Sequence, residues 1–100
     1  MARVSVGKVD DVKPGEVREV VAQGLVVAIY NVGGTLFATD GVCLHRGGPL
    51  GQGELAGNVV TCPLHGWTYD VTSGQSLVNP MAKLKTYPVS VEDGEIRLDL

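Results

Sequence analysis

The sequence predicts an all-β protein built from short antiparallel strands. Valine is abundant and occurs in short runs that glycine, proline or Asp-Gly pairs interrupt. No stretch repeats its apolar residues with the 3.6-residue period of a helix. With 100 residues, of which 44% are apolar, the chain can build one modest core but not two. We therefore expect a single domain over residues 1–100, folded as a β-sandwich or a small barrel.

The first expected hairpin lies in the N-terminal half of the chain. An apolar run over residues 25–32 is followed by Gly33-Gly34 and by a shorter run over residues 35–39. The segment LVVAI at residues 25–29 is apolar on both alternations, which is typical of a central strand covered on two sides.

The second expected hairpin lies at the C-terminus. Apolar and polar residues alternate over residues 87–91 and again over residues 95–100. Between the two runs stands Asp93-Gly94, a pair that readily adopts the positive φ angles of a two-residue turn.

One long stretch, residues 41–66, differs from the rest of the chain. It holds seven of the fourteen glycines, and we expect residues 43–67 to form an irregular excursion from the strands. Loops of that length inside a compact domain usually carry function. The same stretch contains every cysteine and histidine of the chain: Cys43, His45, Cys62 and His65.

These four side chains form a metal-binding pattern, Cys-x-His followed after sixteen residues by Cys-x-x-His. Thiolates and imidazoles bind zinc, iron–sulfur clusters and some copper ions, so the residue types alone leave the metal open. Glycines near the ligands let backbone N–H groups turn inward, which suits the negatively charged sulfides of a cluster. A zinc ion held by thiolates has less need of such groups.

The segments CLHRGGPL (43–50) and CPLHGWTYD (62–70) resemble the two cluster-binding loops of Rieske-type [2Fe–2S] proteins. The resemblance covers nearly the whole chain. It implies an antiparallel β-sandwich or small barrel with a cluster-binding subdomain formed by two loops, at about residues 41–50 and 61–70.

The resemblance also implies one [2Fe–2S] cluster per chain and its ligands. Cys43 and Cys62 would hold the inner iron. His45 and His65 would hold the outer iron, each through one ring nitrogen, with the other nitrogen left at the protein surface.

Four further positions gain expected roles from the resemblance. Tyr69 would hydrogen-bond toward the cysteine Cys43. Trp67 would either support its loop or face a partner, and Arg46 would be a solvated charge or a docking contact. Pro80 resembles the proline of a loop that covers the cluster from a third side.

The loops depart from respiratory Rieske proteins at three positions. Gly48 and Leu64 stand where those proteins carry two cysteines joined in a disulfide, and Trp67 stands in place of a serine whose hydroxyl lies near the cluster. A hydrogen bond donated to a cluster sulfur stabilises the reduced state, so the missing serine lowers the potential. These departures make the chain similar to the low-potential ferredoxin components of ring-hydroxylating dioxygenase systems.

The resemblance implies a one-electron carrier between a flavin-dependent ferredoxin reductase and a terminal oxygenase. The chain has no GxGxxG motif after a strand and no P-loop, and the cluster uses both histidines. We therefore expect an electron-transfer component without a catalytic site of its own. Two alternatives stay open. One is a Rieske-like small subunit fixed to the large subunit of a nitrite reductase or another multicomponent oxidoreductase; the other is a structural zinc module.

Composition limits the partners and the compartment. A formal net charge of −3 with scattered lysines and arginines offers no face for nucleic acid. The sequence has no apolar run of about 18 residues and no apolar N-terminal segment, so we expect neither a membrane span nor a signal peptide. We expect a cytoplasmic monomer, and in the cytoplasm paired cysteines are more often metal ligands than disulfides.

A redox titration tests this interpretation of the loops. We expect a potential of roughly −150 to 0 mV near neutral pH, at the low end of the Rieske range. The potential should fall in alkaline solution, because oxidation of the cluster favours loss of a proton from the uncoordinated nitrogens of His45 and His65. A value above about +200 mV, or a potential that stays constant up to about pH 11, would contradict the prediction.

Overall fold

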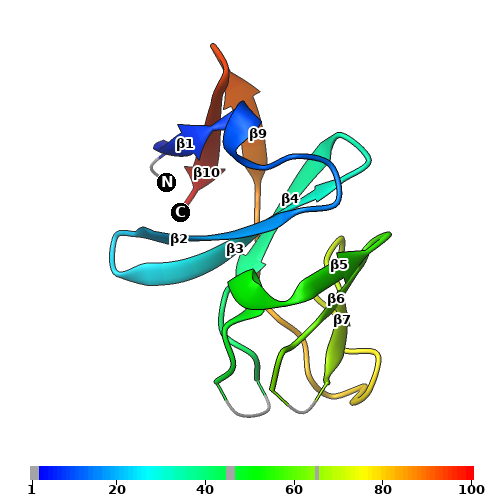
Figure 1. Ribbon diagram of the computed structural model, residues 1–100. Coiled ribbons are helices and arrows are strands. Elements are labelled where there is room, and N and C mark those ends of the chain that lie inside the picture. The colour runs from blue at the N-terminus through cyan, green and yellow to red at the C-terminus, as the bar shows by residue number, and fades with distance from the viewer. Residues whose placement is uncertain (1–2, 45–46, 65) are drawn as a thin grey trace.

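The computed structural model describes residues 3–44, 47–64 and 66–100, and this part of the chain is all-β (Figure 1). Its ten strands form three antiparallel sheets, and its helical residues form only two short 3-10 turns, Val9–Asp11 and Leu50–Gln52. The predicted fold class is confirmed. No helical segment of the described residues has the length and apolar character needed to cross a membrane.

Two sheets form the base of the molecule. The first has the order β1 (Arg3–Lys8), β10 (Glu95–Asp99), β9 (Val89–Glu92). The second has the order β2 (Val17–Ala22), β3 (Leu25–Val32), β4 (Thr35–Asp40), β8 (Thr86–Tyr87). The buried side chains of this base form one core cluster: Val12, Val27, Ile29, Ala38, Tyr87, Ile96 and Leu98.

The third sheet consists of β5 (Glu54–Ala56), β6 (Val59–Thr61) and β7 (Thr68–Asp70) and lies below the base in Figure 1. A second core cluster joins it to the sheet of β2, β3, β4 and β8, called the middle sheet below. Its buried members are Ala28, Tyr30, Cys43, Leu50, Val60, Cys62, Tyr69, Val71 and Leu84. Both cysteines are therefore part of a hydrophobic core.

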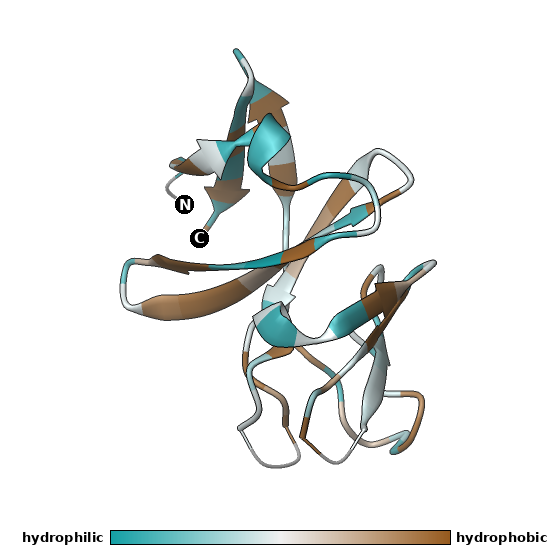
Figure 2. Ribbon diagram, viewed as in Figure 1, coloured by the Kyte–Doolittle hydropathy of each residue, from teal (hydrophilic) through white to brown (hydrophobic). Residues whose placement is uncertain are grey.

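Strand β3 connects the two cores because its successive side chains point to opposite faces. Val27 and Ile29 belong to the base core, whereas Ala28 and Tyr30 belong to the core that contains the cysteines. All four are 0% exposed, which explains why the strand is apolar on both alternations and appears brown in Figure 2. The prediction of a central strand covered on two sides is confirmed.

Both predicted hairpins are present. Strands β3 and β4 pair from Val27↔Asp40 to Val32↔Thr35, and Gly33 and Gly34 form the turn with φ of 58° and 101°. Strands β9 and β10 pair up to Glu92↔Glu95, and Asp93 and Gly94 have φ of 53° and 77°. Positive φ at both central residues is what a type I′ turn requires.

The prediction that residues 43–67 form one long irregular excursion is wrong. Strands β5 and β6 lie within this stretch and pair from Glu54↔Thr61 to Ala56↔Val59 around Gly57 and Asn58. Each strand has only three residues, and the neighbouring glycines hide them in the sequence. The Gly-Asn pair between two short apolar segments is the signal that could have located this hairpin.

The run over residues 87–91 is divided between two sheets. Pro88 has no N–H to donate and separates β8 of the middle sheet from β9 of the first sheet. The chain thus crosses from one layer of the base to the other at this proline. Strands β1 and β2 lie outside the two predicted hairpins, and β2 joins β3 through a turn at Gln23 and Gly24, with φ of 51° and 77°.

Candidate metal centre

Each cysteine lies in a loop that is closed by the same kind of backbone hydrogen bond. In the first cysteine loop, residues 43–48, the Cys43 N–H donates to the Gly48 carbonyl at 2.8 Å. In the second cysteine loop, residues 62–67, the Cys62 N–H donates to the Trp67 carbonyl at 2.7 Å. Each cysteine therefore opens a loop that closes on a carbonyl five residues later. The described residues of both loops lie toward the lower end of the molecule in Figure 1.

Strands hold both loops at their bases. The first loop follows β4, and two backbone hydrogen bonds fix its base. The Gly41 N–H donates to the Val26 carbonyl at 2.8 Å, and the Leu50 N–H donates to the Gly41 carbonyl at 2.9 Å. The second loop connects β6 to β7, whose pairing sets Val60 opposite Tyr69. The middle and third sheets thus bring together two cysteines that are far apart in sequence.

The two sulfur atoms meet in a buried, apolar environment. Cys43 and Cys62 are 2% and 1% exposed. Burial raises the pKa of the Cys62 thiol, and its contact with the Cys43 thiol raises this pKa further, although the Leu64 N–H opposes the shift. A bound metal ion deprotonates such thiols outright, so the pair fits a metal centre.

Gly48 marks the point where the two loops touch. A Cβ atom added at this glycine would lie 2.6 Å from Cys62 Sγ and 3.2 Å from Leu64 Cβ. The close approach therefore requires a residue without a side chain. Positions 48 and 64, which the resemblance assigns to a disulfide in respiratory proteins, do lie together, but here they meet through a packing contact.

Tyr69 joins strand β7 to the first cysteine loop. Its hydroxyl lies 3.3 Å from Cys43 Sγ and accepts a hydrogen bond from the Leu44 N–H at 3.1 Å. The expected contact between Tyr69 and Cys43 is present. Burial and the interaction with Cys43 raise the pKa of Tyr69 well above its usual value, so the hydroxyl keeps its proton and can donate a hydrogen bond to a thiolate.

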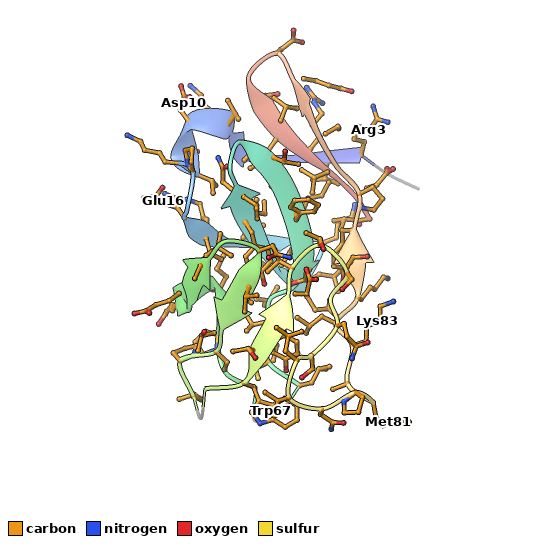
Figure 3. The ribbon with its side chains drawn as sticks, turned by 90° about the vertical axis from the view of Figure 1, so that its right-hand side faces the viewer. Arg3, Asp10, Glu16, Trp67, Met81 and Lys83 are labelled. Atoms are coloured by element: carbon orange, nitrogen blue, oxygen red, sulfur yellow. The ribbon has the colours of Figure 1, made fainter. Side chains whose placement is uncertain are left out.

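Trp67 supports the second loop from its closing end. Its half-buried ring packs against the core cluster that contains the cysteines and lies 6.5 Å from the Tyr69 ring, at an interplanar angle of 45°. Figure 3 shows Trp67 at the tip of the molecule. Pro80 is exposed, and its carbonyl accepts a hydrogen bond from Gln75 Nε2 at 3.2 Å.

The remaining expected site residues, His45, Arg46 and His65, lie outside the described residues. Their roles stay predictions. The residues that are described contain no group of three or more potential metal ligands. Gln75, whose side-chain amide holds the loop of residues 76–82, was not predicted, because no pattern in a single sequence distinguishes it from an ordinary polar surface residue.

Comparison with known proteins assigns the family. The family model of the Rieske [2Fe-2S] domain matches residues 2–88. The chain belongs to the Rieske [2Fe–2S] family. Rieske domains hold a [2Fe–2S] cluster with two cysteines and two histidines, and the buried thiol pair fits the cysteine half of that set.

Individual relatives of this Rieske protein are ferredoxins. The ferredoxin component of the naphthalene 1,2-dioxygenase/salicylate 5-hydroxylase systems of Ralstonia sp is 38% identical, over 91% of this chain and 88% of the relative. The solved structure of a Sphingomonas yanoikuyae B1 ferredoxin superposes with a TM-score of 0.91 at 35% identity, covering 99% of both chains. A chain from a complex of reduced oxygenase and oxidized ferredoxin in carbazole 1,9a-dioxygenase gives 0.89 at 32% identity, covering 96% and 91%.

These matches confirm the prediction of a Rieske-type ferredoxin that binds a [2Fe–2S] cluster and acts as an electron-transfer component. They also decide between the cluster and the zinc module that the donor types left open. The [2Fe–2S] cluster needs a pair of cysteine thiolates on one iron. The hydrophobic core that contains Cys43 and Cys62 provides that pair.

Adding a methyl group at the loop contact should impair cluster binding. We expect Gly48→Ala to lower the iron content of the purified protein substantially, because the new Cβ would displace Cys62 Sγ, and overpacking of this kind costs about 1–3 kcal/mol. Iron analysis and visible absorbance give the measurement. Gly57→Ala is the matched control, because it strains a positive φ of 61° but meets no atom within 4 Å. Equal iron content in both variants would contradict the prediction.

Removing the Tyr69 hydroxyl should lower the reduction potential. We expect Tyr69→Phe to shift the potential down by roughly 40 mV for each kcal/mol by which the hydrogen bond to Cys43 is stronger in the reduced state than in the oxidised state. Tyr30→Phe is the control, because its hydroxyl lies in the same core but bonds to Thr39 at 2.8 Å. If both variants kept the wild-type potential in a redox titration, the proposed effect of Tyr69 would be wrong.

Proposed function

We propose that this chain carries single electrons from a flavin-dependent ferredoxin reductase to a terminal oxygenase. The observation that carries the proposal is the position of the buried thiol pair, which lies in two loops at one end of a compact β-structure (Figure 1). A cluster held there would be close to a partner that binds this end. The Ralstonia sp relative is the ferredoxin component of naphthalene 1,2-dioxygenase/salicylate 5-hydroxylase systems.

The proposed ligands divide between the two irons of the cluster. Cys43 and Cys62 hold the inner iron, and His45 and His65 hold the outer iron. When bound, the cluster supplies a couple that accepts and releases one electron. The burial of both cysteines supports their inner assignment, and the proposed histidine edges give the electron a route to a partner.

The chain's own residues tune and protect this couple. The apolar core around Cys43 and Cys62 keeps water from the sulfurs. The Tyr69 hydroxyl donates toward Cys43 Sγ and favours the more negative, reduced state. The hydrogen bonds that close both cysteine loops hold the donor atoms in place, so their geometry changes little when the charge changes.

A diffusing carrier and a fixed subunit differ in how they meet their partners. We favour a diffusing cytoplasmic monomer with residues 1–100 acting as one domain, and the 38% identical relative is the ferredoxin component of its dioxygenase and hydroxylase systems. A carrier of this kind binds each partner weakly and releases it after transfer, so its association rate should fall as salt increases. A fixed subunit would instead co-purify with a large catalytic chain.

An anaerobic mixing experiment tests the function. We expect the reduced holoprotein to be oxidised by the terminal oxygenase of a naphthalene 1,2-dioxygenase system in a second-order, salt-sensitive reaction, followed by the visible absorbance of the cluster. Re-reduction by a flavin-dependent ferredoxin reductase should close the cycle. No oxidation by the oxygenase, or stable co-purification with a large catalytic subunit, would contradict a freely diffusing carrier.

A further inference from the structure

A groove separates the start of strand β2 from strand β5. Its volume is about 580 Å³, and residues 15–18 and 51–55 supply most of its lining. Cavities that bind ligands commonly have volumes of about 300–1,000 Å³, so the groove has room for a short segment of chain. Figure 3 shows Glu16, which lines the groove, on a different part of the molecule from Trp67, which lies at the tip. The groove is therefore distinct from the tip that carries the metal centre.

Strand β5 presents an open edge to this groove. It is the outer strand of the third sheet, and it joins β6 through the two-residue turn of Gly57 and Asn58. Ala56 and Val59 flank this turn and form a hydrogen-bonded pair. Because bonded and non-bonded pairs alternate along antiparallel strands, the N–H and C=O of Leu55 point away from β6. Leu55 lines the groove, and none of the backbone hydrogen bonds found outside the strand ladders of the described residues uses these two groups.

Strand β2 forms a second open edge on the other side of the groove. It is the outer strand of the middle sheet and joins β3 through the turn of Gln23 and Gly24. Ala22 and Leu25 flank this turn as a hydrogen-bonded pair, so the N–H and C=O of Val17 point away from β3. Val17 also lines the groove. Two open strand edges therefore border the same groove.

The two edges differ in how well a further strand could reach them. A Cβ atom added at Gly51 would lie 2.5 Å from Glu19 Cβ and 2.9 Å from the Glu19 backbone nitrogen. The 3-10 turn Leu50–Gln52 thus lies directly against β2 at Glu19 and limits pairing along that strand. Strand β5 is therefore the edge with which an added segment would pair.

The charges around the groove are mainly acidic. Three carboxylates line it, those of Asp11, Glu16 and Glu54, with one guanidinium, that of Arg18. The backbone N–H groups at positions 8 and 13 donate to Asp11 Oδ2 at 3.0 Å and to Glu16 Oε1 at 2.8 Å, which holds both carboxylates in place. The open strand edge makes the site, and the carboxylates favour an occupant with basic side chains.

The groove also extends toward the metal centre. Residues 52–54 line both the groove and a smaller cavity of about 310 Å³. Cys62 and Gly66, which belong to the second cysteine loop, line this smaller cavity as well. A segment bound in the groove would therefore lie next to the base of the second cysteine loop.

We propose that this groove binds an extended, basic segment of a partner protein as an added strand on β5. The N–H and C=O of Leu55 pair with the backbone of the segment, and alternate lysine or arginine side chains of the segment meet the carboxylates. Strand addition to an exposed sheet edge is a common way of binding peptides, in which backbone hydrogen bonds give affinity and side chains give specificity. The proposal goes beyond electron transfer and does not depend on the proposed function, because it concerns a separate binding site.

A synthetic peptide tests the groove of the oxidised holoprotein. The probe is an acetylated and amidated heptapeptide of alternating lysine and valine, titrated at low salt. We expect saturable binding of one peptide per chain by calorimetry, and slower hydrogen exchange of the Leu55 N–H in the complex by NMR. A peptide of alternating glutamate and valine is the charge control and should not bind. No saturable binding of the basic peptide, or binding without protection of the Leu55 N–H, would overturn the proposal.

Protein variants separate the strand edge from the charge. Leu55→Pro removes the outward N–H but no hydrogen bond to β6, and it should weaken peptide binding about two- to tenfold. Val21→Pro is the matched control, because the Val21 N–H also points away from β3 but Val21 does not line the groove. Glu54→Gln should weaken binding at low salt more than Asp93→Asn, which removes a carboxylate from the turn between β9 and β10. Equal affinities of Leu55→Pro and Val21→Pro would contradict pairing with β5.

Modified probes keep the test decisive if Leu55→Pro loses its cluster. Lysine and valine N–H groups of an extended probe point to opposite edges, so N-methylation of all lysines blocks one edge and N-methylation of all valines blocks the other. Only one of these two peptides should lose affinity for the wild-type protein, and equal affinities would overturn strand addition. If the wild-type protein alone forms a dimer in sedimentation experiments that Leu55→Pro dissociates, the occupant is a second copy of the chain, and the basic partner segment is wrong.

Discussion

The structure depends on one contact, the meeting of two buried cysteine sulfurs from separate loops. Cys43 and Cys62 stand nineteen positions apart in the sequence, yet Gly48 lets their loops approach until no side chain fits between them. Two thiolate charges this close together and shielded from water repel each other. Neutral thiols at the same place are not stabilised by hydrogen bonds to water. Only a metal centre makes this arrangement favourable when both sulfurs are charged.

The three sheets can be understood as the support for that contact. Strand β3 places alternate side chains in two cores, so the base and the cysteine loops share one rigid element. Tyr69 extends the support from β7 to the first loop by a hydrogen bond to Cys43. The site thus rests on strands rather than on its own loops, which is how a donor set is held while its charge changes.

At the end of the molecule that carries the metal centre, polar and apolar side chains point in opposite directions. Polar groups are directed inward, where Tyr69, Ser76 and Gln75 satisfy sulfur and backbone atoms. Apolar groups are directed outward, where Leu77 and Met81 meet solvent. A carrier must keep its redox centre fixed, and the inward-directed hydrogen bonds hold the loops beside that centre.

The sequence by itself determined the ligand candidates, the two hairpins at Gly33-Gly34 and Asp93-Gly94, and the doubly buried strand β3. These features are local, because turn residues and the alternation of apolar side chains act within a few positions. Only the tertiary structure decided that Pro88 passes the chain between sheets and that Gln75 holds the loop of residues 76–82. Those features depend on which backbone groups meet across the folded chain, and no spacing within the sequence encodes that meeting.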